Sequence, residues 1–183
     1  ELDGAKLKII IEARTPQTSL CNFTNHSYFN LDYSGSLKNH YLLVKSDEIV
    51  ELDNNKLPTG RLLNVDGSKF DFRSETKLSD QCGSVASLDN NFCFSSSATE
   101  LCEVAELVAS GCKMVLSTTE PGLQVYTGSS LSPPLKPFQG IALEPQLWPD
   151  SPNNEGFPNA FLRAGEIYKQ ITEYSFINTR SSE

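Results

Sequence analysis

Glu144 is the residue whose position in the sequence most strongly suggests a chemical role. It lies between Leu143 and Pro145 at the end of an apolar stretch. Burying an unpaired carboxylate in such surroundings costs several kcal/mol. A carboxylate can act as a base at neutral pH. The position therefore favours a functional role for Glu144 over a packing role.

The sequence contains two histidines, His26 and His40. An imidazole titrates near neutral pH and can transfer protons, but a single histidine taken alone is more often an ordinary loop or core residue. His40 precedes the apolar stretch 41–44 and has no carboxylate motif around it. We expect His40 to be structural, whereas the assignment of His26 depends on the motif that surrounds it.

The sequence indicates neither a metal site nor a reactive cysteine. The His and Cys residues form no cluster with ligand-like spacing, so we expect no metal and no cofactor. The cysteines lack a CxxC pair, which favours reduced, mostly buried thiols over a disulfide framework and is consistent with a cytoplasmic location. No cysteine lies in a recognisable activating sequence, which argues against a cysteine nucleophile. There are five cysteines: Cys21, Cys82, Cys93, Cys102 and Cys112.

Length and charge narrow the classes of function. A chain of 183 residues is long enough for one domain with an apolar core. Its net charge of −8, from 15 Lys and Arg against 23 Asp and Glu, argues against nucleic acid as a partner, because phosphate binding needs clustered cations. No apolar run approaches the roughly 20 residues that cross a bilayer, so we expect no membrane association.

The apolar pattern predicts β-strands throughout. Apolar residues alternate or form short β-branched runs, and turn sequences rich in Gly, Asn, Asp and Pro separate them, which is typical of a sandwich or barrel. Only 70–79 hints at a helical turn, and the proline-rich stretch 132–137 is expected to be a surface loop. Strands are expected at 7–11, 41–44, 91–94, 102–107, 112–118, 124–127, 140–143 and 166–176.

Five motifs in order along the chain resemble those of the aldose 1-epimerase (galactose mutarotase) family. A single tripeptide match would be weak, but five in the family's order make coincidence implausible. They are Thr-Asn-His-Ser-Tyr-Phe-Asn-Leu at 24–31, Pro-Thr-Gly at 58–60, Leu-Asp-Asn-Asn-Phe at 88–92, Ser-Thr-Thr-Glu-Pro-Gly-Leu-Gln-Val-Tyr-Thr-Gly at 117–128, and Ala-Leu-Glu-Pro-Gln-Leu-Trp-Pro-Asp-Ser-Pro-Asn at 142–153 with its continuation to 168.

The resemblance implies a fold and a reaction. The fold would be all-β, a galactose-mutarotase-like antiparallel β-sandwich (supersandwich) with a sugar cleft on one sheet. The activity would be that of an aldose 1-epimerase, an isomerase that interconverts the α and β anomers of galactose or glucose by opening the ring. The family's roles, carried to the matching positions, make Glu144 the base and His26 the acid. Asp89 and Gln124 would bind sugar hydroxyls, a task that suits an amide with one acceptor and two donors.

These assignments have plainer alternatives. Asp89 with Asn90 and Asn91 is also a good turn sequence, and Gln124 could point to solvent. Trp148 could stack on a sugar, but a single tryptophan is more often part of the core. Many members of the family have a histidine where this chain has Asn90. An electrostatic tether between Asp89 and that imidazole ring would therefore be absent here or replaced by an amide.

The resemblance covers the latter half to two-thirds of a family member. We therefore expect residues 1–183 to be the C-terminal part of a single mutarotase-like domain, incomplete at its N-terminus. The missing N-terminal part of the same enzyme, which in the family supplies another histidine and an arginine, would be its partner; alternatively, the segment would be an incomplete gene product that pairs with something else. The isolated 183 residues should then show little mutarotation. Without that part, sheet edges and an apolar face would be left uncovered.

Two other functions remain open. A non-catalytic sugar-binding or regulatory module would keep the cleft and lose turnover. An epimerase of phosphorylated hexoses would need cations around the cleft, and neither Arg61 nor Arg73 lies in a sequence that indicates such a cluster.

Overall fold

The protein consists of short antiparallel strands joined by turns. The computed structural model describes residues 1–80, 83–94 and 100–179. Within these residues there is no α-helix, and a single 3-10 turn, η1, spans Ser151–Asn153. The strands are β1 (Leu2–Asp3), β2 (Lys6–Ala13), β3 (Ser19–Leu20), β4 (Tyr28–Phe29), β5 (Tyr41–Val44), β6 (Glu48–Leu52), β7 (Pro58–Asn64), β8 (Thr76–Lys77), β9 (Asp89–Cys93), β10 (Cys102–Ala109), β11 (Cys112–Thr118), β12 (Gly122–Tyr126), β13 (Ile141–Gln146), β14 (Phe161–Leu162) and β15 (Tyr168–Asn178).

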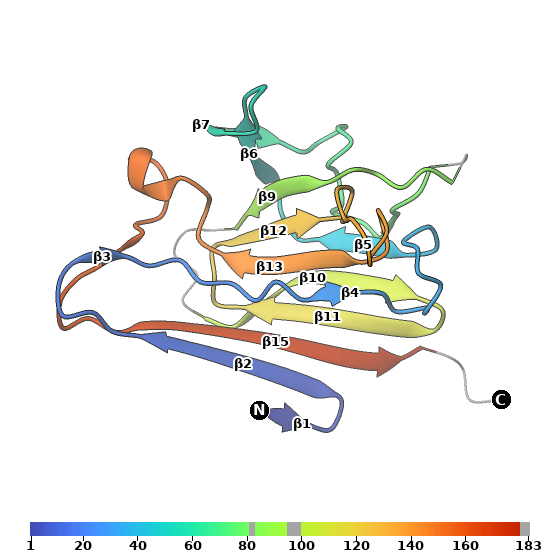
Figure 1. Cartoon of the computed structure of the whole chain (residues 1–183), viewed down its shortest axis with the longest axis horizontal. Helices are drawn as coiled ribbons and strands as arrows, with labels where there is room; N and C mark the ends of the chain where they lie inside the picture. Colours follow the sequence, from blue (N-terminus) through green and yellow to red (C-terminus); the bar gives the residue numbers. More distant parts are fainter. Residues whose placement is uncertain (81–82, 95–99, 180–183) are drawn as a thin grey trace.

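Two sheets face each other and form a sandwich (Figure 1). The seven-stranded sheet has the order β1-β2-β15-β11-β10-β5-β8, and the six-stranded sheet has the order β4-β13-β12-β9-β6-β7. Strands β3 and β14 form a separate two-stranded ribbon. The all-β antiparallel sandwich expected from the sequence is thus confirmed.

The core lies between the two sheets. Alternate residues of each strand point inward, which is why period-two sequences fold this way. Leu107, Met114 and Leu116 enter the core from the seven-stranded sheet, and Leu123 and Leu143 enter it from the six-stranded sheet. All five are fully buried. The inward row of each strand leaves the other row free to carry polar side chains on the outer face.

The apolar periodicity located the long strands well. Strands β5 and β11 have the predicted bounds, and the other predicted strands differ by a few residues at their ends. One difference concerns the site, because β13 continues through Pro145 to Gln146. Glu144 therefore lies inside a strand and takes its orientation from the sheet.

The predicted helical turn at 70–79 is wrong. The segment has bends and the short strand β8 in place of a helical turn, and β8 pairs with β5 through Leu42 and Thr76. Phe72 and Leu78 are both buried in the core. Because burial of these two side chains outweighs a weak local preference for helix, tertiary packing decides the conformation.

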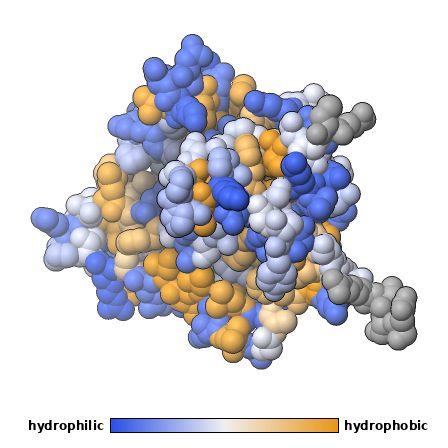
Figure 2. All heavy atoms as spheres, turned by 45° about the vertical axis from the view of Figure 1, so that its right-hand side comes forward, coloured by the Kyte–Doolittle hydropathy of each residue, from blue (hydrophilic) through white to orange (hydrophobic). Residues whose placement is uncertain are grey.

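The outer surface contains both polar and apolar regions. Figure 2 shows a hydrophilic top, where the β6–β7 hairpin lies in Figure 1, and apolar residues gathered toward the bottom. Leu2 on β1, and Leu7 and Ile10 on β2, are exposed. The stretch 132–137 forms an exposed loop, as predicted.

The thiols are only partly as predicted. Cys21 and Cys93 are buried, Cys112 is half-buried and Cys102 is exposed, and all four are free. Cys82 lies outside the described residues. Among the described residues, no helix is long and apolar enough to span a membrane. The cytoplasmic location stays a prediction.

Candidate functional site

A row of polar side chains crosses the outer face of the six-stranded sheet. Asn91 on β9, Gln124 on β12 and Glu144 on β13 are direct register partners. Directly paired residues of neighbouring antiparallel strands project to the same face. Their strand neighbours Leu123 and Leu143 point into the core, so the three polar side chains point outward.

His26 reaches this row from the edge of the sheet. It precedes β4, whose Tyr28 pairs with Ala142 on β13. Upstream, Asn22 accepts a hydrogen bond from the Leu147 amide at 3.0 Å. The segment is thus attached to β13 on both sides of His26, and the His26 Nε2 atom lies 3.4 Å from the Glu144 Oε1 atom. The structure brings together the two residues that the sequence analysis paired.

The two partners differ in their exposure to solvent. The Glu144 side chain is 8% exposed, whereas the His26 side chain is 51% exposed. Burial raises the pKa of Glu144; the nearby imidazole of His26 opposes this shift, and the negative charge of Asp89 adds to it. A carboxylate with a raised pKa is a stronger base than an exposed one.

Aromatic rings adjoin the pair. The His26 ring lies 5.0 Å from the Tyr28 ring, which contacts Tyr126 on β12 edge to face at 6.2 Å. Burial raises the pKa of Tyr28, and Tyr126 and Glu144 add to the shift. Tyr28 therefore stays a neutral phenol next to the pair, able to donate or accept a hydrogen bond.

Asp89 and Gln124 lie together beside the pair. Gln124 Nε2 donates to Asp89 Oδ1 at 2.9 Å. Both side chains line a cavity of about 160 Å³ on the outer face. The remaining lining residues come from β6, β7, β9, β13 and the connections next to them: Val50, Leu52, Lys56, Pro58, Asn91, Gln146 and Pro149. The cavity thus has apolar and polar walls. Glu144 and His26 are not among its lining residues, and Glu144 adjoins it through its register partner Gln124.

Comparison with known proteins identifies the family. The sequence profile of the family Aldose 1-epimerase matches residues 1–175. The chain belongs to the aldose 1-epimerase family. Galactose mutarotase of Mus musculus is 38% identical over 188 residues, a match that covers 96% of this chain and 55% of that protein. Aldose 1-epimerase of Escherichia coli K12 is 35% identical, with coverage of 96% and 56%.

Solved structures agree with this assignment. The GalM/aldose epimerase homologue from C. elegans superposes with a TM-score of 0.87 at 28% identity, covering 96% of this chain and 57% of that one. Galactose 1-epimerase from Lactobacillus acidophilus shares the fold, with a TM-score of 0.81 at 24% identity and coverage of 96% and 54%. The chain spans about half the length of these relatives. The N-terminal partner segment expected from the sequence stays a prediction.

Other residues singled out in this family member have structural roles. His40 is fully buried, its Nε2 accepts a hydrogen bond from the Leu31 amide at 2.9 Å, and burial lowers its pKa. The indole of Trp148 donates to the Pro121 carbonyl at 2.7 Å and packs on Phe157. Asn90 pairs with the core residue Val125 and so alternates to the opposite face from Asp89.

The cations considered for a phosphate site are engaged elsewhere. Arg61 pairs with Glu51 at 2.6 Å, and Arg73 pairs with three aspartates, Asp47, Asp66 and Asp71. Neither arginine lines the cavity. In the part of the chain that the structure describes, no group of three or more His, Cys, Asp or Glu residues is placed to hold a metal ion.

Lys56 is a charged cavity residue that was not expected from the sequence. Its Nζ atom lies 3.8 Å from Asp89 Oδ2. The sequence signal is faint, since Lys56 lies in the turn-like run 53–57 between strands that the apolar pattern did not predict. Its relation to Asp89 depends on the β6–β7 hairpin folding next to β9.

Proposed function

We propose that the protein is an aldose 1-epimerase that interconverts the anomers of galactose or glucose, with Glu144 as base and His26 as acid. The observation that carries the proposal is the 3.4 Å separation of the two side chains beside a polar cavity on one sheet face. The names of its relatives, galactose mutarotase and aldose 1-epimerase, support the same reaction.

The reaction needs one proton acceptor and one proton donor that act on adjacent atoms. The O1 hydroxyl and the ring oxygen O5 of a pyranose are bonded to the same carbon, C1. Groups acting on both must therefore lie within a few ångströms of each other. His26 and Glu144 meet this requirement, because each can turn toward a different one of the two oxygens.

The chemical steps follow from these positions. Glu144 removes the O1 proton while protonated His26 donates its proton to O5. The C1–O5 bond breaks, and its electron pair goes to O5, giving an aldehyde at C1 and a hydroxyl at C5. Rotation about the C1–C2 bond exposes the other aldehyde face. Ring closure then runs the same transfers in reverse and returns both protons to their starting groups.

The residues around the pair have distinct roles in this proposal. Asp89 and Gln124 bind sugar hydroxyls and hold C1 near Glu144. Their mutual hydrogen bond fixes the Gln124 amide so that its Nε2 faces Asp89, which leaves the second Asp89 oxygen for the substrate. The burial of Glu144 keeps water away from the carboxylate and strengthens it as a base.

The test is the substitution Glu144→Gln in the natural protein, followed by polarimetry of freshly dissolved α-galactose and α-glucose. The proposal predicts a loss of catalysed mutarotation of about 10²-fold or more, with sugar affinity largely kept. Glu12→Gln, an exposed glutamate on β2 paired with Lys169, is the matched control. If the rate survives in Glu144→Gln, Glu144 is not the base. If the unsubstituted protein binds sugar but shows no catalysed mutarotation, the non-catalytic sugar-binding function takes precedence.

A further inference from the structure

The tip of the β6–β7 hairpin has a well-defined conformation. Asp53 Oδ1 accepts hydrogen bonds from the backbone amides of Asn55 at 2.8 Å and Leu57 at 2.9 Å. The Asp53 amide donates to the Leu57 carbonyl at 2.8 Å, and the Lys56 amide donates to the Asp53 carbonyl at 3.0 Å. Because four hydrogen bonds close this short loop, the Cα–Cβ direction of Lys56 is set by the backbone.

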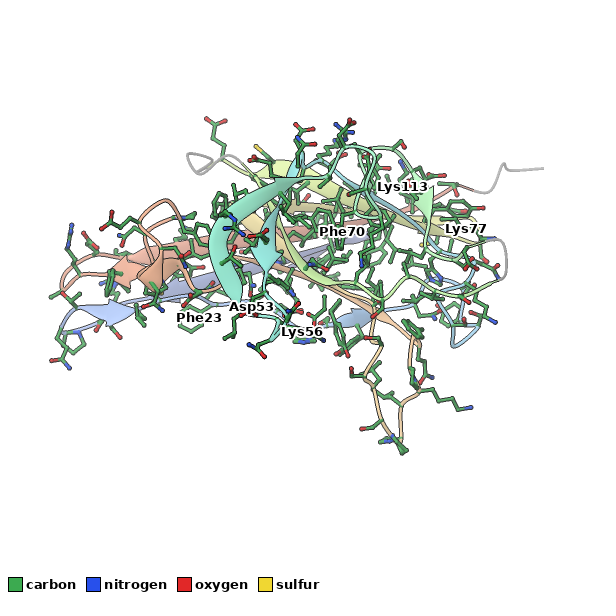
Figure 3. All side chains as sticks on the ribbon, turned by 90° about the horizontal axis from the view of Figure 1, so that it is seen from above. Phe23, Asp53, Lys56, Phe70, Lys77 and Lys113 are labelled. Carbon is green, nitrogen blue, oxygen red and sulfur yellow. The ribbon has the colours of Figure 1, made fainter. Side chains whose placement is uncertain are left out.

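Lys56 adopts an unusual backbone conformation. Its φ is 63°, in the left-handed region that glycine or asparagine occupies at lower cost. A lysine at such a position is uncommon in a hairpin loop. Figure 3 places Lys56 close to Asp53 and on the same side of the sandwich as Phe23, in the segment that leads to His26. Lys56 lines the cavity from this position, and its side chain is 74% exposed.

The separation of Lys56 from Asp89 leaves room for one oxygen atom. The 3.8 Å between Nζ and Oδ2 exceeds the usual hydrogen-bond range of about 2.7–3.2 Å. A hydroxyl oxygen next to both atoms could accept from the ammonium and donate to the carboxylate. Oδ1 of Asp89 already accepts from Gln124, so Oδ2 is the oxygen available for that contact.

The charge of the cavity wall suits a neutral ligand. Lys56 and Asp89 contribute one positive and one negative charge, and the other polar lining residues are the amides Asn91, Gln124 and Gln146. An anionic substituent next to Lys56 would also face the carboxylate of Asp89. A polyol meets no such repulsion, because each hydroxyl both donates and accepts.

Asp89 lies two strands away from Glu144. Strand β12 separates β9 from β13, and neighbouring strands are about 4.7–4.9 Å apart. Asp89 also lies two residues before Asn91, the β9 member of the polar row, so it is displaced from Glu144 along the strands as well as across them. Gln124, on the strand between them, links the two positions through its hydrogen bond to Asp89. Asp89 and Glu144 would thus contact different parts of one bound pyranose.

We propose that Lys56 and Asp89 form a subsite for a single sugar hydroxyl distal to the anomeric carbon. Lys56 donates to that hydroxyl, and Asp89 Oδ2 accepts from it. The subsite orients the ring so that C1 lies between His26 and Glu144. The inference rests on the proposed function and adds Lys56 to it as a residue that determines which neutral aldoses bind well.

Measurements of sugar affinity test this subsite independently of the catalysed rate. In the natural protein, Lys56→Met keeps the length of the side chain and removes its charge. The matched control is Lys169→Met, which removes an exposed lysine paired with Glu12 on the other sheet. Calorimetric titration with galactose should show an affinity lowered about tenfold by Lys56→Met and unchanged by Lys169→Met. Lys56→Arg should restore part of the loss.

A series of monodeoxy-galactoses identifies the hydroxyl. One deoxysugar should bind the wild type and Lys56→Met equally, because it lacks the group that Lys56 contacts, whereas the others should keep the tenfold difference. An equal loss for every deoxysugar, no loss for galactose, or tighter binding of galacturonate than of galactose by the wild type would each overturn the subsite. Loss of turnover in Glu144→Gln is a separate measurement, so failure of the proposed reaction is distinguishable from failure of this subsite.

Discussion

The carboxylate of Glu144 is almost completely buried, and the imidazole that lies 3.4 Å from it, on His26, is half exposed. The sheet orients Glu144 through its pairing with Gln124, and the edge segment before β4 carries His26. The proposed base is therefore held within a strand, while the proposed acid is open to solvent.

The catalysed rate should depend on pH through Glu144. Because burial raises the pKa of Glu144, the carboxylate becomes protonated, and inactive as a base, at a higher pH than an exposed glutamate would. Mutarotation followed by polarimetry, with the uncatalysed rate subtracted, should therefore fall on the acid side at a pH above the ordinary range of a glutamate. An acid limb at or below that ordinary range would contradict the role of buried Glu144.

Asp89→Asn should move the acid limb to lower pH. The negative charge of Asp89 raises the pKa of Glu144, so neutralising Asp89 lowers that pKa and keeps Glu144 ionised in more acidic solution. A loss of sugar affinity of about tenfold should accompany the shift, since Asp89 lines the cavity. Asp3→Asn on β1, in the other sheet, is the control and should change neither quantity.

Gly122→Ala should destabilise the protein beneath the cavity. A Cβ atom at residue 122 would lie 2.8 Å from the Trp148 ring and 3.0 Å from the Asn91 amide. Overpacking of this kind costs about 1–3 kcal/mol. Urea unfolding should show this loss, whereas Gly156→Ala, whose Cβ would meet nothing within 4 Å, should leave the midpoint nearly unchanged. Equal midpoints for the two variants would show that the described packing around Gly122 is wrong.

Glu120→Gln should stabilise the protein at neutral pH. Glu120 is 5% exposed, accepts a hydrogen bond from the Tyr168 hydroxyl at 2.8 Å, and its Oε2 lacks a partner among the described residues. Burial raises its pKa, so the folded protein binds a proton more readily than the unfolded chain, and the wild type loses stability as pH rises above the unfolded-state pKa. The neutral amide avoids that loss and keeps an acceptor for Tyr168.

The gain from Glu120→Gln should be on the order of 1 kcal/mol near pH 7 and should disappear as pH falls below the ordinary range of a glutamate. Denaturation midpoints of wild type and variant measured across this range are the test. Glu12→Gln, at an exposed site, should show no such trend. A constant difference between wild type and Glu120→Gln at all pH values would mean that ionisation of Glu120 is not its cause.

The sequence predicted the fold and the central pair for different reasons. Long strands such as β11 appear as apolar alternation, and Glu144 and His26 lie in motifs that resemble those of a family. The β6–β7 hairpin escaped prediction because charged residues, Pro58 and Gly60 interrupt its pattern. Lys56 was missed for the same reason, since its distance from Asp89 depends on how that hairpin packs next to β9.

The wrong prediction of a helical turn at 70–79 shows that tertiary packing can overrule a local sequence preference. Local sequence favoured that turn only weakly, and burial of Phe72 and Leu78 in one core holds the segment in a non-helical path. The contact between Gln124 and Asp89 was likewise beyond the sequence, because it depends on the register of β9 and β12. Which residues share a face follows from pairing that no local pattern specifies.

The most direct test of the account is a crystal structure of the Glu144→Gln variant with galactose bound. The account predicts that O1 lies within about 3 Å of the amide at position 144 and O5 within about 3 Å of His26 Nε2, with a distal hydroxyl at Asp89. A sugar bound on another face, or one whose anomeric carbon lies far from both side chains, would contradict it.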